Sequence, residues 1–339
     1  MFASSSDLLF GSHPGRLQAE TPLSRLCRFA EPPLASISYK PSETHTLYVS
    51  YSRGFKGGGF DPRGNATITP DTNRDGVRSY NEIYDFFAFD PESVDSYELG
   101  WRGSMLDRRL TVALTGFYAD YKDVQIPGSV GIDANGDGVF ETFAGVTTNA
   151  ASAEMKGFEL ETTAILARDF AGGGSTINFT GTLGFIDAKY KTFIDAFGND
   201  VADIRAIQNT PKWTVSGTPA AALPVGDGMV NGSTTVSWRS KTNQFEVPSP
   251  YLDQPGYALW DASLVWTDKS DRYSIGLHAK NIADQRYITS GYQFLQVKPD
   301  GTPLLTSTGA LRPSLGREGV VTAFYGNPRQ VYVTVGLKF

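Results

Sequence analysis

The chain has 339 residues and a formal net charge of −6, with acidic and basic residues scattered along its length. The lack of a basic stripe argues against a nucleic-acid partner, and no apolar run reaches the roughly 18 residues that a transmembrane helix needs. Aromatic residues make up 12% of the chain and glycine occurs 36 times. This composition favours β-strands joined by many turns.

Residues 1–33 show neither a strand-like nor a helical period, and they are rich in serine, proline and arginine. They also lack the basic segment and apolar stretch of a secretory signal peptide. We leave this segment unassigned and expect it to be disordered or non-native. Residues 34–339 are expected to form one β-barrel domain.

From Leu34 onward, apolar and polar residues alternate in segments of roughly ten residues. Residues 272–280 show this most clearly, and residues 328–339 repeat it up to the terminal Phe339. Successive side chains of a strand point to opposite sides, so each segment has one apolar and one polar face. The pattern predicts eleven strands, over residues 34–40, 44–53, 94–104, 109–121, 151–165, 175–190, 211–223, 229–240, 257–267, 272–282 and 328–339.

The connections between these strands alternate strictly between short and long. An outer-membrane barrel has short periplasmic turns and long extracellular loops, so the alternation predicts an antiparallel transmembrane β-barrel. A soluble β-sandwich is the alternative, but its turns come at regular short spacing, and several long loops would be unusual there. The long connections cover residues 54–93, 122–150, 191–210, 241–256 and 283–327.

Five segments resemble motifs of TonB-dependent receptors, in the family's order. Residues 33–60 (PLASISYKPSETHTLYVSYSRGFKGGGF) and 94–127 (VDSYELGWRGSMLDRRLTVALTGFYADYKDVQIP) resemble hairpins of the barrel. NAASAEMKGFELE (149–161) is similar to the family's Lys-Gly-x-Glu-x-Glu strand. AKNIADQRY (279–287) is similar to its penultimate-strand signature Asn-Leu-x-Asp-x-x-Tyr, with isoleucine for the leucine. Residues 327–339 resemble its last strand, which ends in an aromatic residue.

The resemblance implies the second half of a barrel of about 22 strands, a size with a plugged lumen. It also implies a Gram-negative outer-membrane location and uptake of a scarce ligand, most often an iron–siderophore complex, powered through TonB. The plug, the TonB-contacting segment and the first strands would precede Leu34 and are absent from this sequence. The implied partners are outer-membrane lipid, a ligand such as a ferric siderophore, and TonB only through the missing plug.

An odd number of alternating strands creates a problem of closure. The first and last of eleven strands run the same way, and single-chain bacterial barrels are antiparallel throughout. An open sheet in lipid leaves unpaired N–H and C=O groups that cost several kcal/mol each; ten strands without residues 34–40 would close. We therefore interpret the chain as the product of a truncated gene, a split gene or a misplaced start. A passive porin or adhesin barrel, a non-functional product and a soluble glycan-binding module remain alternatives.

Residues 71–82 fit the calcium-loop template Asp-x-Asn-x-Asp-Gly-x5-Glu. We expect no helix on either side, and Arg78 stands where an apolar residue is usual. Residues 133–144 begin a second template but lack its glutamate; polar tight turns are the alternative reading of both. A bound Ca²⁺ would order an extracellular loop. The candidate ligands are Asp71, Asn73, Asp75, Val77 through its carbonyl, Ser79 and Glu82.

The sequence shows no Ser/His/Asp or Cys/His constellation, so it does not predict an enzyme. His278 is expected to be a polar residue of the lumen wall, and the long connection 54–93 is where we expect ligand contacts, without assigned residues. Several charged residues fall on the polar strand faces, where they either solvate a wet interior or hold a plug by ion pairs. These are Glu98, Arg102, Glu159, Glu161, Arg239 and Lys280.

Overall fold

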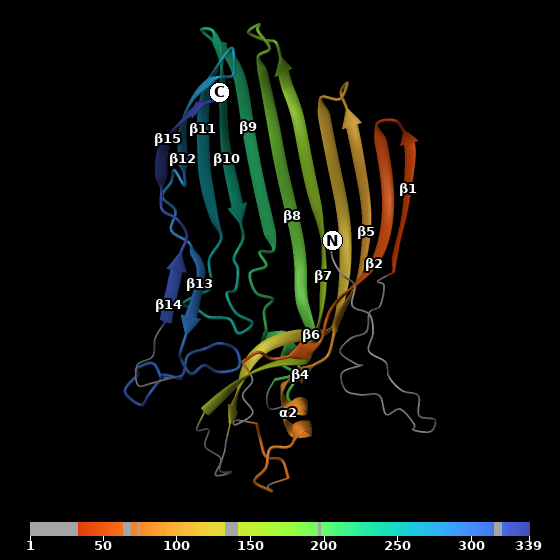
Figure 1. Ribbon diagram of the computed structural model, residues 1–339, viewed down its shortest axis with the longest axis vertical. Coiled ribbons are helices and arrows are strands. Elements are labelled where there is room, and N and C mark those ends of the chain that lie inside the picture. Colours follow the sequence, from red (N-terminus) through yellow and green to blue (C-terminus); the bar gives the residue numbers. More distant parts are fainter. Residues whose placement is uncertain (1–32, 64–68, 74, 133–141, 196–197, 315–320) are drawn as a thin grey trace, which may run out of the picture.

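The computed structural model describes residues 33–63, 69–73, 75–132, 142–195, 198–314 and 321–339. Its main element is one antiparallel 11-stranded sheet in which the strands neighbour each other in chain order (Figure 1). This confirms the predicted fold class. The strands are β1 (Leu34–Ser42), β2 (His45–Lys56), β5 (Glu92–Met105), β6 (Leu110–Ile132), β7 (Thr142–Arg168), β8 (Thr176–Phe193), β9 (Trp213–Val225), β10 (Gly228–Arg239), β11 (Tyr257–Asp268), β12 (Tyr273–Lys280) and β15 (Gln330–Leu337).

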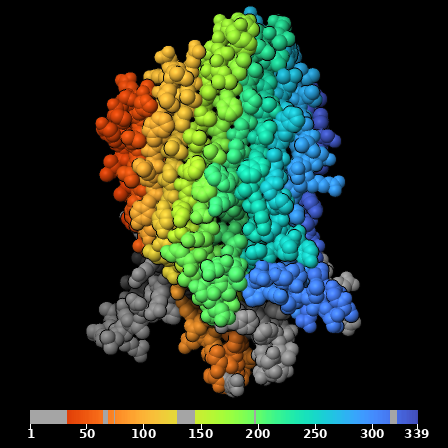
Figure 2. Space-filling view, turned by 180° about the vertical axis from the view of Figure 1, so that it is seen from behind, coloured from red at the N-terminus to blue at the C-terminus, as the bar shows by residue number. Residues whose placement is uncertain are grey.

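The two ends of the sheet differ in the length of their connections. The short connections lie together at one end, at the top of Figure 1, and the long ones gather at the other. At the short-turn end, Gly226 has a φ of +63° in the two-residue link from β9 to β10, a conformation that favours glycine. Figure 2, from behind, shows the strands as one continuous curved wall with the long-loop segments below it.

The strand register places large apolar residues of neighbouring strands on one face of the sheet, which we call the apolar face. Leu47 of β2 lies opposite Trp101 of β5, and Trp101 lies opposite Leu114 of β6. At the other edge, Leu277 of β12 lies opposite Val333 of β15. Large apolar side chains on this face are exposed, as the lipid-facing band of a barrel requires.

The opposite, polar face carries the six charged residues that the alternation had placed there. Glu98 pairs with Ser50 and Phe117, and Lys280 pairs with Gln330, all on this face. The strand period of two therefore assigns the faces correctly from sequence.

Two strands run further than predicted. β6 continues to Ile132 and β7 begins at Thr142, because the pair bends at a bulge instead of ending. The register shifts between Tyr121 and Val124, and Asp123 has a φ of +56°. A bulge resets the alternation of side chains, which is why the pattern in the sequence stops there.

The expectation that no helix flanks residues 71–82 is wrong. Helix α2 (Tyr80–Phe87) starts inside this segment, with Ser79 as N-cap and Glu82 completing a capping box. Phe87 and Val146 of β7 form a buried cluster, against which Ile83 and Phe86 pack. The apolar residues therefore recur at helical spacing and fix the helix on the sheet.

The long connections contain further short elements that the sequence pattern did not predict. They form β3 (Gly59–Phe60) with β4 (Ala88–Phe89), the hairpin of β13 (Ile288–Gln293) and β14 (Val321–Tyr325), and the 3₁₀ helix η2 (Ala202–Ile204). No helix in the described part of the chain is long and apolar enough to cross a membrane. Residues 1–32, with Cys27, and most of the second calcium-type stretch lie outside the described residues.

Candidate functional site

The main buried cluster of the molecule lies at the long-loop end of the sheet. Ala151 and Ala153 of β7 contact Tyr190 and Phe193 of β8, and Val201 of the following connection packs on them. Ala202 and Ile207 add to the cluster. The β8–β9 connection is therefore held against the sheet by apolar burial, which gives the mouth of the sheet a defined shape.

A pocket of about 620 Å³ lies beside this cluster. Its walls come from the extended parts of β6 and β7, from the end of β8, and from the connections that follow β8 and β10. We call it the mouth pocket, and the residues that define it here are Ile126, Val146, Asn149, Phe193, Arg205 and Glu246. Its volume lies in the range typical of small-molecule sites, about 300–1,000 Å³.

Arg205 supplies the positive charge of the mouth pocket. Its guanidinium carbon lies 5.6 Å from the centre of the Phe193 ring, in cation–π range. Its Nη1 donates a hydrogen bond of 2.6 Å to the carbonyl of Pro299. The ring comes from the end of β8 and the carbonyl from the connection between β13 and β14, so together they fix the orientation of the guanidinium beside the pocket.

Glu246 supplies a carboxylate on the same pocket wall. Its Oε1 accepts a hydrogen bond from Nε2 of Gln208, and its backbone carbonyl accepts from the N–H of Ala206. The pocket thus presents one cationic residue, Arg205, and two acidic residues, Asp195 and Glu246, within a mainly apolar lining. Such a surface can orient a ligand that has rings and charged groups together.

Two amide side chains fasten the long connection 54–93 to the sheet. Asn149 accepts from the N–H of Asp90 (2.7 Å) and donates to the carbonyls of Asp90 and Asp123 (both 2.8 Å). Gln125, which is buried, donates to the carbonyls of Gly57 (2.9 Å) and Asp90 (3.1 Å). Because Asn149 also lines the mouth pocket, the connection 54–93 is fixed to one of its walls.

Asp61 forms a second attachment of this connection. Its buried carboxylate accepts from Nε and Nη2 of Arg63 and from Oγ1 of Thr147 in β7. Nη2 of Arg63 also donates to the carbonyl of Val146. The hydrogen bonds from Arg63 lower the pKa of Asp61 to about 2, so this carboxylate is charged at neutral pH.

The calcium-type residues make local hydrogen bonds in this structure. Asp71 accepts from the N–H groups of Asp75 and Gly76, and Asp75 accepts from that of Val77. These contacts form a compact turn, with Gly76 at a φ of +82°.

Glu82, the last residue of the template, is already used by its neighbours. Its Oε1 accepts from Thr72, and its Oε2 accepts from Ser79. These hydrogen bonds, that from Thr72 first, lower the pKa of Glu82 to about 2. No group of three or more His, Cys, Asp or Glu side chains that could hold a metal occurs within the described ranges.

His278 lies on the polar face of β12, as the alternation predicts. Its Nδ1 is 2.9 Å from Oγ of Ser263, its Nε2 is 3.0 Å from Oγ1 of Thr334, and its ring stacks on Tyr332. These neighbours on β11 and β15 account for both ring nitrogens. The residue is therefore a hydrogen-bonded part of the sheet wall.

The family model "TonB dependent receptor-like, beta-barrel" matches residues 33–282, well over half of the chain. The chain belongs to this family. Its TonB-dependent-receptor fold was predicted from the strand pattern and the five motif segments, and this match confirms the recognition.

Among curated proteins, the chain is similar to the pesticin receptor of Yersinia enterocolitica, with 26% identity over 267 residues. The match covers 76% of this chain and 32% of that receptor. The chain therefore spans about a third of the length of the curated relatives that it matches.

Among solved structures, the ferric yersiniabactin uptake receptor of Yersinia pestis is similar to this chain with a TM-score of 0.59 and 20% identity, covering 90% of this chain and 37% of the receptor. The siderophore receptor PiuA of Acinetobacter baumannii gives 0.56 and 16%, covering 90% and 35%. At these identities the likeness shows the fold alone. The relatives are receptors and transporters, which agrees with the prediction that the chain is not an enzyme.

The structure explains the penultimate-strand signature of this TonB-dependent-receptor chain. Asn281 donates to the carbonyl of Asn327, Asp284 accepts from the N–H of Arg329, and the carbonyl of Tyr287 accepts from the N–H of Gly326. These three signature residues thus bind the segment just before β15. We call this set of contacts the strand clip.

Sequence reasoning missed the residues of the mouth pocket. Arg205 and Glu246 lie in long connections without a period, and nothing in their spacing places them beside Phe193. The region 54–93, where ligand contacts were expected, contributes none of the residues that line the mouth pocket; it is only hydrogen-bonded to Asn149, which does. For Asp61, the Asp-x-Arg spacing was visible, but its partner Thr147 is far away along the chain.

Proposed function

We propose that the chain is the C-terminal part of the barrel of an outer-membrane receptor that takes up a ferric siderophore, powered through the TonB complex. The mouth pocket is the observation that carries this proposal, because it lies at the long-loop end, which faces the outside in such barrels. The relatives named as ferric yersiniabactin and ferric preacinetobactin receptors support the ligand class. The apolar face would contact outer-membrane lipid.

The pocket offers apolar walls for the rings of an iron chelate and one place, at Arg205, for an anionic group. The guanidinium of Arg205 can pair with a carboxylate or phenolate of the ligand, and Phe193 keeps it in place. The apolar walls can cover the ring systems. Asn149 then offers a neutral polar contact at the same pocket wall.

A fluorescence titration tests this function. The full chain in detergent is titrated with ferric yersiniabactin, ferric preacinetobactin and ferric citrate, and quenching of its tryptophans is measured. We expect saturable quenching by one of these probes and about tenfold weaker binding by Arg205→Ala, equivalent to about 1.4 kcal/mol. Arg168→Ala, at the short-turn end, is the matched control and should bind as the parent does.

The outcomes separate the alternatives. If Arg205→Ala binds the ligand with the same affinity as the parent, the ligand binds outside the mouth pocket. No saturable binding of any probe, together with a steady conductance in planar bilayers, would favour a passive porin or adhesin barrel. If the chain shows no ligand binding and no conductance, the remaining interpretation is a non-functional product.

We also propose that residues 71–82 bind Ca²⁺ and thereby order their connection. The turn made by Asp71, Asn73 and Asp75 supports this proposal, while Glu82 would have to release Thr72 and Ser79 to become a ligand. Calorimetric titration with Ca²⁺ should show binding that Glu82→Gln weakens at least about tenfold. Asp85→Asn, on the same helix but outside the template, is the control; equal binding by both variants would reject the site.

A further inference from the structure

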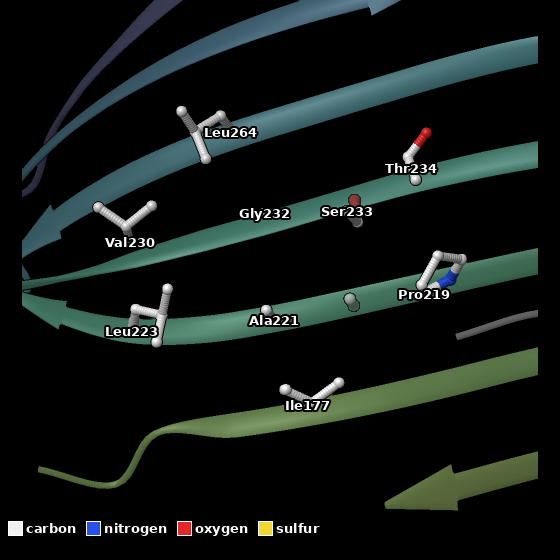
Figure 3. Close-up of a pocket in the computed structure, with 10 residues that line it drawn as sticks. Ile177, Pro219, Ala221, Leu223, Val230, Gly232, Ser233, Thr234 and Leu264 are labelled. Carbon is white, nitrogen blue, oxygen red and sulfur yellow. The ribbon is translucent and has the colours of Figure 1, made fainter. Parts of the chain in front are cut away.

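A hollow lies in the apolar face of the sheet, near the short-turn end. Its volume is about 340 Å³, and it crosses β8, β9, β10 and β11. Figure 3 shows Ile177, Leu223, Val230 and Leu264 arranged around it, with no side chain standing over Gly232. We call this hollow the wall groove.

The register of four strands explains the wall groove. Ile177 lies opposite Ala221, Ala221 opposite Gly232, and Gly232 opposite Leu264. Two large side chains therefore stand on either side of two of the smallest residues. Val230 lies opposite Leu223 and closes the groove towards the short turns.

The lining of the groove has almost no polar surface. Ser233 points to the other face in Figure 3. The hydroxyl of Thr234 donates to the carbonyl of Asp261 (3.0 Å) and accepts from Nε1 of Trp260 (2.6 Å). A polar group of a ligand would find no free partner here and would lose its hydration, so the groove fits a hydrocarbon chain.

A turn with two basic residues lies close to the end of this groove. Gly228 pairs with Asp268 and lies two residues from Val230, which is about 7 Å along a strand. Lys269 and Arg272 belong to the turn that follows Asp268. An anionic group bound at this turn would therefore be within reach of the groove.

The acidic residues of this turn are already engaged. Asp268 accepts from the hydroxyl and N–H of Ser270 and from the N–H of Tyr273, and Asp271 pairs with Lys338. Among the ion pairs of the described residues, none includes Lys269 or Arg272. Asp227 and Asp268 remain charged, so they balance Lys269 and Arg272 in number and the two turns carry no excess of either sign. Lys269 and Arg272 are nevertheless held by no ion pair among the described residues, which leaves both cations available to a phosphate.

We propose that the wall groove binds one acyl chain of a phospholipid whose phosphate lies at Lys269 and Arg272. The proposal rests on the membrane placement proposed above, and it adds a specific lipid site to that placement. The apolar lining selects the hydrocarbon, and the basic turn selects the headgroup. A second copy of the chain seated on the groove is the competing occupant.

Photolabelling tests this site on the full chain. The chain is placed in mixed micelles of detergent and phosphatidylglycerol that carries a diazirine in its acyl chain, then irradiated and mapped by mass spectrometry. We expect residues 219–223 and 230–234 to take at least about fivefold more label than residues 331–335. Labelling in proportion to exposure would give the opposite order, because Val333 and Val335 are 61% and 80% exposed while the groove residue Leu223 is 37% exposed.

Variants separate the groove from the basic turn. Ala221→Leu fills the floor of the groove and should lower its label about fivefold, while Ala258→Leu, on the same face of β11 but outside the groove, should not. Lys269→Gln with Arg272→Gln leaves the groove intact and should lower its label about threefold. If Ala221→Leu does not fold, as judged by circular dichroism, the charge variant alone decides.

Three results would overturn the proposal. Label that follows exposure along all strands rejects the site, and so does label that none of the variants changes. Cross-links between two chains at the groove would assign it to a second copy. If the chain stays soluble without detergent and no strand takes lipid label, the proposed location in the membrane is itself rejected.

Discussion

Asp61 shows how one buried carboxylate can hold a long connection on a sheet. It accepts from Arg63 beside it in sequence and from Thr147 across the fold. Its side chain is 1% exposed, whereas that of Arg63 is 49% exposed. Loss of the charge would remove the ion pair with Arg63 and weaken the hydrogen bonds that Arg63 and Thr147 donate.

We expect Asp61→Asn to weaken this attachment by about 1.5–3 kcal/mol, the range for hydrogen bonds to charged groups. Because the folded pKa of Asp61 is lowered to about 2, its contribution is complete above the ordinary carboxyl pKa of about 4 and is lost as the pH falls towards 2. Hydrogen exchange of residues 57–63 and 145–149, measured at pH 7 and pH 3, checks both statements. Unchanged exchange in Asp61→Asn would show that the contact does not hold the connection.

At the level of elements, the strand clip fixes the start of β15. Asn281 is buried, and its side chain bonds Gln285 and Asn327. Its φ is +47°, a left-handed conformation that asparagine tolerates and alanine does not favour. The residue therefore contributes through its side chain and through its backbone.

We expect Asn281→Ala to cost about 2–4 kcal/mol and Asn281→Gly to cost less, since glycine removes only the hydrogen bonds and not the conformational match. Limited proteolysis within residues 325–330 measures the release of the clip. If both variants resist proteolysis as the parent does, Asn327 and Arg329 are held by the sheet and not by the clip.

At the level of the whole molecule, the odd number of strands in the sheet limits how it can close into a barrel. The edges are β1 and β15, and in an antiparallel sheet of eleven strands these two run in the same direction. A second copy rotated about the axis of the wall would place β15 beside a parallel β1, which the antiparallel pattern of such barrels does not allow. The sheet therefore needs a complement with an odd number of strands.

A disulfide test follows from this odd number of strands. Ile37→Cys with Val333→Cys, one on each edge strand, should not cross-link in the chain alone once Cys27 is replaced by serine. Ile37→Cys with Val49→Cys is the control, because these two residues are register partners in β1 and β2. Efficient cross-linking of the edge pair on non-reducing gels would mean that the chain closes by itself.

The faces of the sheet and the order of its strands could be predicted because both depend on local patterns. The period of two assigns Glu98 and Lys280 to one face and Leu277 to the other, and each short turn can only join antiparallel neighbours. The bulge at Asp123 and the helix α2 were missed. At the bulge, one residue resets the alternation. Helix α2 is too short to be stable alone, and it forms because Phe87 is buried against Val146.

The sequence by itself thus determined the strands, their faces and the family of this chain, because alternation and turn length act between near neighbours. Only the tertiary structure decided which connections meet. Arg205 in the mouth pocket contacts Phe193 and Pro299 from other parts of the chain, and the wall groove exists because Ala221 and Gly232 are register partners. Such contacts depend on burial and register between segments that are far apart in the chain, and no local pattern encodes them.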